Sequence, residues 1–318
     1  MKKILIISSN RLGDSILSSG LNKFFKDKNY SVTFACGPLP YGLFKFCGNI
    51  DKIFSFKKKK FSLHWLYLWM KVIFNFWECV VDLRGSAISF FLFTKKRLIY
   101  KNLINDELHK TKSVSSLVTK RNLPPNFKLN FTKQKSKNFE ILKLKRGKYK
   151  NVILVAPCAN WIGKTWPIDR FVTLIKKLRE DKIFSKSKFI IIGAADEKKK
   201  MKKLLNNKSI NLLDLVGKID LIEMYNLMQK SNLFIGNDSG LMHLAALAKV
   251  PTVGLFGPSD LKKYRPFGIK TLAIKSPKNF NELMGYEGFN PKKVNSLMIS
   301  LKVNHVYAKI IKFYKGLK

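Results

Sequence analysis

The sequence predicts an α/β protein of two Rossmann-like domains, each built on a mostly parallel sheet. The chain has 318 residues, 46% of them hydrophobic, and a single core usually stops growing at about 250 residues. Short β-branched and apolar runs alternate with helical patterns, which is typical of βα repeats. A lysine-rich stretch with little periodicity, residues 123–149, contains Pro124 and Pro125 and separates two halves. We therefore expect an N-terminal domain at residues 1–148 and a C-terminal domain at residues 149–302.

The expected strands are short and recur along both halves. In the first half they are residues 3–7, 31–35, 79–82 and 97–100. In the second half they are residues 151–155, 188–192, 232–236, 251–255 and 271–274. A helix is expected at residues 168–179, because Pro167 suits the first turn of a helix. Residues 303–314 have apolar side chains at helical spacing, so residues 303–318 are expected to form a C-terminal helix that packs back on the N-terminal domain.

The charge of the chain restricts its partners without choosing one. Against 61 Lys and Arg there are 20 Asp and Glu, a net charge of +41, which favours nucleic acid, acidic lipid surfaces or phosphorylated substrates. A proteome-wide preference for lysine would give the same count. Because the chain has no RNP motif and no helix-turn-helix pattern, we expect no nucleic-acid partner.

Cysteine usage and hydropathy predict a cytoplasmic protein. The four cysteines lie far apart without a CxxC pair or a neighbouring His, which indicates neither a disulfide framework nor a zinc site. We expect no metal ion and no resident cofactor. The apolar run at residues 4–7 ends too early for a signal peptide and is expected to be a strand. Residues 61–77 are the most apolar stretch but fall short of the roughly 20 residues that span a bilayer, so no transmembrane helix is expected.

The first candidate for chemistry is Asp14, which follows the first predicted strand and opens a helix. Ligands of open α/β sheets bind beyond the carboxyl ends of the strands, so a carboxylate at this position is a candidate base. The alternative is a capping or first-turn acid that complements the helix dipole. Asp82, at the end of another predicted strand, is the next acid to consider.

Two further candidates follow the first two strands of the second half. Lys164 lies in a loop with Trp161 and Trp166, just before the helix that starts after Pro167, and can contact a bound phosphate. A solvated lysine is the alternative. Glu197 follows the predicted strand at residues 188–192, where an acid commonly binds ribose hydroxyls, although an acid that opens a helix is also ordinary dipole chemistry.

The most informative segment is Asn237-Asp238-Ser239-Gly240-Leu241-Met242-His243. A strand ends here at a turn of small residues and a helix begins, so Ser239 and Gly240 can offer backbone N–H groups to a diphosphate. Asp238 can cap the same helix. His243 falls one turn inside this helix. It is either a donor-site residue or a histidine that belongs to the core. The next strand ends in Phe-Gly-Pro at residues 256–258, a second close approach of backbone to the site.

These segments together resemble glycosyltransferase family 9, the ADP-heptose:lipopolysaccharide heptosyltransferases and their relatives. The resemblance covers most of the chain. It rests on Arg-Leu-Gly-Asp at residues 11–14, Val-Val-Asp-Leu-Arg-Gly at 80–85, Lys-x-Trp-Pro at 164–167 and Asn-Asp-Ser-Gly-Leu-Met-His at 237–243. The resemblance implies the GT-B fold, in which two Rossmann-like domains with mostly parallel sheets face each other across a cleft. The second domain then holds the donor and the first the acceptor.

The resemblance also implies roles for the candidate residues. Asp14 would be the catalytic base, Lys164 and the turn Asp238–Gly240 would hold the donor diphosphate, and Glu197 would hold the ribose. The implied donor is a nucleoside-diphosphate sugar, ADP-heptose. The implied acceptor is a lipopolysaccharide core or a similar lipid-linked glycan.

The expected reaction is direct displacement at the anomeric carbon with inversion. It requires no metal, because a lysine and a helix N-terminus can stabilise the leaving diphosphate, and the sequence has no Asp-x-Asp pair for a metal-bound diphosphate. Three alternatives stay open. They are a nucleotide-sugar 2-epimerase of the same fold, a non-catalytic polyanion-binding protein, and a family member that has lost catalysis.

A membrane surface is the last partner that the sequence suggests. The lysine run at residues 57–60 precedes the aromatic stretch 61–77, which contains Trp65, Tyr67, Trp69 and Trp77, residue types that favour the membrane interface. We expect peripheral attachment to the anionic inner-membrane surface through this segment. An ordinary buried helix of the first domain is the alternative.

Overall fold

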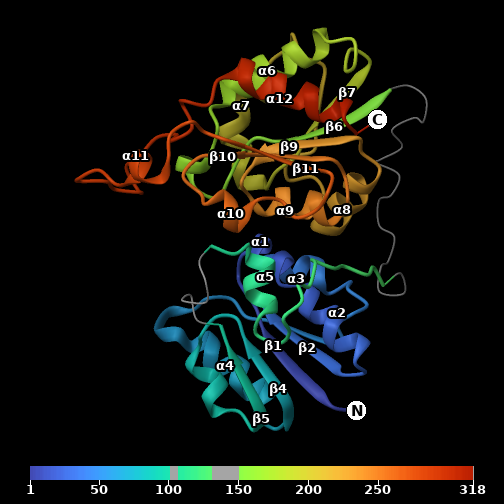
Figure 1. Cartoon of the computed structure of the whole chain (residues 1–318), viewed down its shortest axis with the longest axis vertical. Helices are drawn as coiled ribbons and strands as arrows, with labels where there is room; N and C mark the ends of the chain where they lie inside the picture. Colours follow the sequence, from blue (N-terminus) through green and yellow to red (C-terminus); the bar gives the residue numbers. More distant parts are fainter. Residues whose placement is uncertain (101–106, 131–149, 318) are drawn as a thin grey trace. The chain divides into compact units, whose positions relative to one another are not determined.

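The computed structural model describes residues 1–100, 107–130 and 150–317. The chain divides into two compact units, Met1–Ser136 and Lys137–Lys318, each a continuous stretch of sequence (Figure 1). The domain boundary predicted between residues 148 and 149 lies outside the described residues and stays a prediction.

The first unit contains a five-stranded sheet with short helices between the strands. Its strands are β1 (Lys3–Ile7), β2 (Ser31–Cys36), β3 (Lys52–Ser55), β4 (Trp77–Asp82) and β5 (Thr94–Ile99). Its helices are α1 (Leu12–Leu17), α2 (Gly20–Asp27), α3 (Pro38–Phe44), α4 (Leu63–Val72) and α5 (Lys110–Ser115), with 3₁₀ turns η1 (Lys60–Ser62) and η2 (Ala87–Phe91).

All strand pairs of this sheet are parallel, in the order β3-β2-β1-β4-β5. The chain winds outward from β1 to β3 and then crosses to the other side of β1, so α4 lies on the face opposite α2 (Figure 1). Leu68 and Val72 of α4 pack on Leu5 and Ile7 of β1 in a core that also includes η2. The order reverses between β1 and β4.

The second unit has a six-stranded sheet and longer helices. Its strands are β6 (Asn151–Ala156), β7 (Ser187–Ile191), β8 (Leu212–Asp214), β9 (Leu233–Asn237), β10 (Thr252–Phe256) and β11 (Thr271–Lys275). Its α-helices are α6 (Ile168–Glu180), α7 (Lys202–Leu205), α8 (Leu221–Gln229), α9 (Gly240–Leu247), α10 (Leu261–Tyr264), α11 (Phe280–Met284) and α12 (Val303–Lys315), with 3₁₀ turns η5 (Ile162–Lys164) and η6 (Ala195–Met201).

This sheet is also parallel throughout, in the order β11-β10-β9-β6-β7-β8. It is the Rossmann order, with the reversal between β6 and β9. The core is deep: Trp166, Phe171, Phe189 and Ile191 are all fully buried in one cluster. Both parallel sheets therefore confirm the predicted α/β class.

The nine predicted strands are all present, most with ends shifted by one or two residues. Two short strands were not predicted, β3 and β8. Both lie at sheet edges, and their sequences, Lys-Ile-Phe-Ser and Leu-Leu-Asp, are too short and too polar to give a buried apolar run. Edge strands are exposed on one side, so their sequence signal is weak.

The C-terminal helix α12 packs within the second unit. Its buried residues Val306, Ile310 and Tyr314 belong to the same core cluster as Leu174 and Leu178 of α6, beside which α12 lies (Figure 1). Tyr314 also donates its hydroxyl hydrogen bond to Asn151 Oδ1 of β6, at 2.9 Å. The expectation that this helix packs back on the N-terminal domain stays a prediction. The sequence predicted the apolar face but not the surface that covers it.

Helices of membrane-spanning length and hydropathy do not occur among the residues for which the structure gives positions. The apolar stretch at residues 61–77 is divided between η1, α4 and β4.

We predict that Ile310→Ala lowers the free energy of unfolding of the second unit by about 2–5 kcal/mol, because Ile310 is fully buried and its truncation leaves a cavity. Urea unfolding followed by tryptophan fluorescence measures the change. Lys309→Ala, on the exposed side of the same helix, is the control. Equal unfolding midpoints for the two variants would contradict the packing of α12 described above.

Candidate functional site

The candidate residues lie at the reversal points of the two sheets. In an open parallel sheet, the loops that follow two neighbouring strands on either side of the reversal diverge and leave a crevice at the carboxyl edge. In the first unit these strands are β1 and β4, which lead to Asp14 and Asp82. In the second unit they are β6 and β9, which lead to Lys164 and to Ser239.

Asp14 is a partly buried carboxylate in the first turn of α1. It is not the N-cap, which is Arg11, and no side chain caps this helix. The hydroxyl of Ser9 donates to Asp14 Oδ2 over 3.4 Å, a long and therefore weak hydrogen bond. A partly exposed carboxylate held this loosely keeps the capacity to accept a proton from a bound hydroxyl group.

Asp82, the other acid at this edge, has a structural role. It is fully buried, and its oxygens accept hydrogen bonds from the backbone of Arg84 at 2.8 Å and from the backbone and hydroxyl of Ser86, both at 2.7 Å. These three bonds hold the turn that leads from β4 into η2. Of the two acids, Asp14 is therefore the one available for chemistry.

Asn10 is a polar group near Asp14 that the sequence did not single out. Its Oδ1 atom is buried and has no hydrogen-bond partner among the described residues. Gly37, at the end of β2, lies so close that a Cβ atom there would come within 2.7 Å of this oxygen. A buried acceptor without a donor is costly unless a ligand supplies one, so Asn10 is a candidate for contact with a hydroxyl group.

Asn237 joins the two sides of the reversal point in the second unit. It is fully buried at the end of β9, and its Nδ2 donates to the carbonyl of Pro157, beyond β6, at 2.7 Å. Its Oδ1 accepts from the backbone N–H of Trp166 at 3.1 Å. Both ends of the loop that carries Lys164 are thereby fixed to β9.

Lys164 is held beside the start of α9 by Asp238. The Lys164 ammonium lies 2.7 Å from Asp238 Oδ2, and the side chains of the two residues are 29% and 8% exposed. Ser259, after β10, donates to the same carboxylate oxygen at 2.5 Å. The predicted site residues Lys164 and Asp238 are thus brought together, with Asp238 orienting the lysine. Ser259 was missed, and its position next to the Phe-Gly-Pro segment that follows a predicted strand was the available signal.

The N-terminus of α9 is ready to bind an anion. Ser239 is the N-cap in an extended conformation, and its side chain makes no capping bond. The first N–H groups of the helix, beginning at Gly240, have no intrahelical acceptors. Ser239 Oγ is buried and lacks a hydrogen-bond partner among the residues that are described. Backbone N–H groups, this hydroxyl and the Lys164 ammonium can together bind a phosphate.

His243 is in the second turn of α9 and only 4% exposed, which fits the core-histidine alternative. Its assignment to the donor site stays a prediction.

Glu197 is half-buried in η6, and its Oε2 accepts from the backbone N–H of Ala194 at 2.9 Å. Helix capping, the alternative use of this acid, is therefore present. Its contact with a ribose also stays a prediction.

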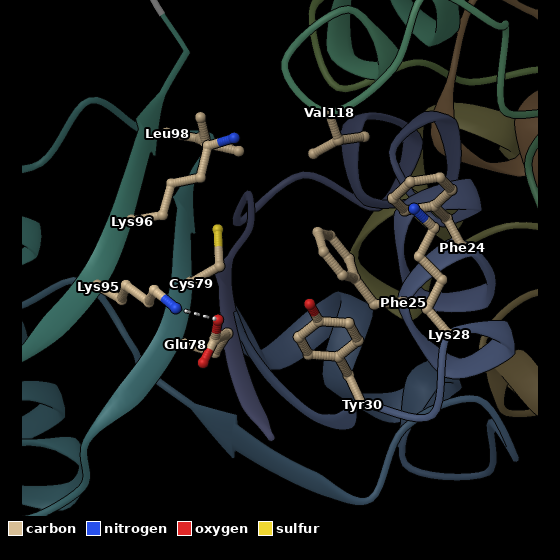
Figure 2. A pocket seen from close by; sticks show the side chains of 10 residues that line it. All are labelled: Phe24, Phe25, Lys28, Tyr30, Glu78, Cys79, Lys95, Lys96, Leu98 and Val118. Carbon is tan, nitrogen blue, oxygen red and sulfur yellow. Dashed lines mark ion pairs between the residues drawn. The ribbon is translucent and has the colours of Figure 1, made fainter. Parts of the chain in front are cut away.

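A pocket of about 380 Å³ lies in the first unit, away from these residues (Figure 2). Phe24, Phe25 and Tyr30 form one wall, and residues near the amino-terminal ends of β4 and β5 form the other. Glu78 and Lys95 pair across 3.4 Å at its rim. Its lining includes Glu78 and Cys79 at the start of β4, whereas Asp82 is at the end of that strand. None of the predicted site residues lines it.

Groups of three or more His, Cys, Asp or Glu side chains that could hold a metal ion do not occur within residues 1–100, 107–130 and 150–317.

Comparison with known proteins gives a family match over more than half of the chain. Residues 103–284 match the model of glycosyltransferase family 9 (heptosyltransferase). A curated relative, lipooligosaccharide heptosyltransferase 2 of Campylobacter jejuni, is 34% identical over 89 residues, which are 26% of this chain. The chain thus spans 28% of the length of that relative.

Solved structures match over nearly the whole length. A glycosyl transferase family 9 protein from Veillonella parvula has a TM-score of 0.78 at 15% identity, with 99% of this chain and 97% of that chain covered. The ADP-heptose lipopolysaccharide heptosyltransferase II of Escherichia coli has a TM-score of 0.72 at 18% identity, with 99% of both chains covered. At these identities the likeness concerns the fold, and it confirms the expected GT-B architecture.

We predict that Asn237→Ala destabilises the second unit by about 2–5 kcal/mol, because it leaves the carbonyl of Pro157 and the N–H of Trp166 buried without their partner. Urea unfolding measures the loss. Asn206→Ala, at an exposed asparagine of the same unit, is the matched control and should change the free energy of unfolding by less than about 0.5 kcal/mol. If the two variants unfold alike, Asn237 does not fix the Lys164 loop.

Proposed function

Because the chain belongs to glycosyltransferase family 9, we propose that it transfers a heptose from ADP-heptose to a hydroxyl group of a lipid-linked glycan, such as a lipopolysaccharide core. The observation that carries this proposal is the anion site of the second unit. Lys164, the N-terminus of α9 and the unpaired hydroxyl of Ser239 converge there. A nucleoside diphosphate is the ligand class that needs several such donors at one place.

In the proposed reaction the two units have separate tasks. Asp14 accepts the proton of the acceptor hydroxyl, whose oxygen forms a bond to the anomeric carbon. The bond from that carbon to the donor phosphate oxygen breaks, and ADP leaves with the bonding electrons. Attack from the side opposite the leaving group inverts the configuration. Lys164 and the N–H groups of α9 stabilise the charge that grows on ADP, so the scheme needs no metal ion.

Two features support Asp14 as the base. A sugar hydroxyl is a poor nucleophile at neutral pH, so a proton acceptor is required. Asp82 is occupied by its three hydrogen bonds, whereas Asp14 has one weak contact. Asn10, with its unpaired buried oxygen, would orient the acceptor hydroxyl beside this base.

An acceptor on a membrane lipid would also bring the protein to the cytoplasmic face of the inner membrane. The net charge of +41 favours this anionic surface. Incubation with ADP-heptose and a delipidated core oligosaccharide tests the transferase proposal directly. A product that forms only when the oligosaccharide is present supports it, whereas conversion of the donor without an acceptor would support the 2-epimerase alternative.

For the donor site we predict that Lys164→Ala weakens ADP binding by about 1–3 kcal/mol, since a charge-assisted contact to the diphosphate is lost. Glu197→Ala should weaken the binding of AMP as well, because the ribose is present in both ligands. Calorimetry with AMP and ADP measures both effects. Lys176→Ala, at an exposed lysine of α6, is the control. Wild-type affinity of Lys164→Ala for ADP would remove Lys164 from the site.

For the base we predict that Asp14→Asn reduces turnover by about 10²–10⁴-fold, the usual contribution of general-base catalysis. Asparagine keeps the size of the side chain but does not accept the proton. Melting temperature and donor affinity should stay close to those of the wild type. Near-normal turnover in this variant would mean that another group serves as base.

A further inference from the structure

The outer face of α4 is apolar and uncovered. Leu63, Leu66 and Met70 lie along one side of the helix and are 50%, 52% and 52% exposed. The inner side, with Leu68 and Val72, packs in the core of the first unit. A helix that only covers a sheet needs one apolar stripe and presents polar residues to water, so a second apolar stripe requires its own explanation.

The uncovered surface continues beyond the helix. Phe74, two residues after α4, is 94% exposed, and Phe90, Phe91 and Phe93 in and after η2 are 63%, 67% and 66% exposed. The indole N–H of Trp69 donates to the carbonyl of Phe91 at 3.0 Å and joins the two segments. We call these exposed apolar residues of α4 and η2, with Phe74 and Phe93, the α4–η2 face. Scattered exposed apolar residues are normal, but a contiguous set is not.

Positive charge borders this face. Lys57, Lys58, Lys59 and Lys60 are all exposed immediately before it, and Lys71 is exposed within it. Between residues 57 and 93 the only acids are Glu78 and Asp82, and Asp82 is buried. An apolar face with lysines at its border is the composition of a helix that lies in the interface of an anionic bilayer.

The exposed apolar residues of this segment differ in part from those that the sequence indicated. Trp77 is 2% exposed, and Trp65 and Trp69 pack against the core of the first unit. Trp77 therefore belongs to the interior, and Trp65 and Trp69 are partly buried. Tyr67, which is 43% exposed, lies at the surface together with the leucine, methionine and phenylalanine side chains.

We propose that the α4–η2 face docks on an anionic lipid bilayer and inserts its phenylalanines among the lipids. The proposal rests on the proposed function, in which the acceptor is carried on a lipid. The turn Asp82–Ser86 links this face to the sheet edge at which Asp14 lies, since β4 and β1 are neighbours there. Docking through η2 thus holds the acceptor side of the candidate site close to the lipid surface.

A bilayer fits this face better than a second copy of the chain does. Two copies would bring two lysine runs together on a protein of net charge +41, and like charges repel. An anionic surface has the complementary charge and also a hydrocarbon layer for the aromatic side chains.

The test is co-sedimentation of the full chain with vesicles of phosphatidylcholine alone and of phosphatidylcholine with phosphatidylglycerol. The wild type should bind the anionic vesicles and bind less at high salt. Phe74→Ser with Phe91→Ser should reduce the partition coefficient by about tenfold or more, because two aromatic side chains no longer enter the bilayer. Lys57→Gln with Lys58→Gln should reduce it by about 30-fold on anionic vesicles, that is, about fivefold per lysine.

Matched control variants distinguish binding through this face from nonspecific binding through other exposed apolar side chains or lysines. Phe280→Ser removes an exposed phenylalanine of the second unit, and Lys199→Gln with Lys200→Gln removes two of its exposed lysines. Both should bind vesicles almost as the wild type does. Wild-type binding by the Phe74/Phe91 variant, or equal binding to both kinds of vesicle, would overturn the proposal.

Two further measurements complete the test. If sedimentation velocity finds a dimer that the Phe74/Phe91 changes convert to a monomer without loss of vesicle binding, the face belongs to a second copy and the proposal is wrong. Transfer to a delipidated oligosaccharide should be unchanged in that variant. Failure of the wild-type chain to bind anionic vesicles, with its transfer to the delipidated oligosaccharide intact, would reject the docking surface and leave the proposed reaction standing.

Discussion

The amide of Asn237 holds the second unit in the form that its chemistry requires. A sheet whose strand order reverses leaves a crevice between two diverging loops, and nothing in the backbone ladder connects them. Asn237 makes that connection by bonding at once to Pro157 and to Trp166. Lys164 lies between those two points, so its ammonium can meet Asp238 and the start of α9 in one arrangement. Asparagine suits the position because its amide offers a donor and an acceptor without a charge that burial would penalise.

The ion pair of Lys164 with Asp238 shapes the electrostatics of this site. A lone ammonium ion would attract any anion, but the pair is close to neutral, and Ser259 shares the carboxylate. Attraction for a ligand therefore comes from the oriented N–H groups of α9 together with the hydrogens of Lys164 that Asp238 does not use. Such a site favours a ligand with several oxygens at fixed spacing over a simple anion. The remaining lysines of the chain contribute a diffuse field rather than specificity.

The sequence predicted the strands that are buried on both faces and the residues that follow them, because apolar runs and small-residue turns are local signals. The positions of Asp14, Lys164 and Ser239 after the ends of strands could be predicted in this way. The sequence could not predict that Asp238 orients Lys164 or that α12 packs against α6, because these contacts join residues that are distant in sequence. Nor could it predict that the Asp82 carboxylate accepts the hydrogen bonds of the turn after β4, because this depends on the local backbone geometry. The tryptophans near residue 70 illustrate the same limit. Residue type suggested a membrane interface, but packing decides which side of a helix faces out, and Trp65 and Trp69 face the core.

Because α12 stays with the second unit, the chain passes from one unit to the other only once. Neither unit needs a strand or helix from the far end of the sequence to complete its sheet. The first sheet can therefore close as soon as β5 has left the ribosome, while the second half is still being synthesised. Until then one edge of β4 lacks the partner that β5 provides. The order of synthesis thus allows the most apolar part of the protein to become buried in the first unit before the apolar residues of the second core have been synthesised.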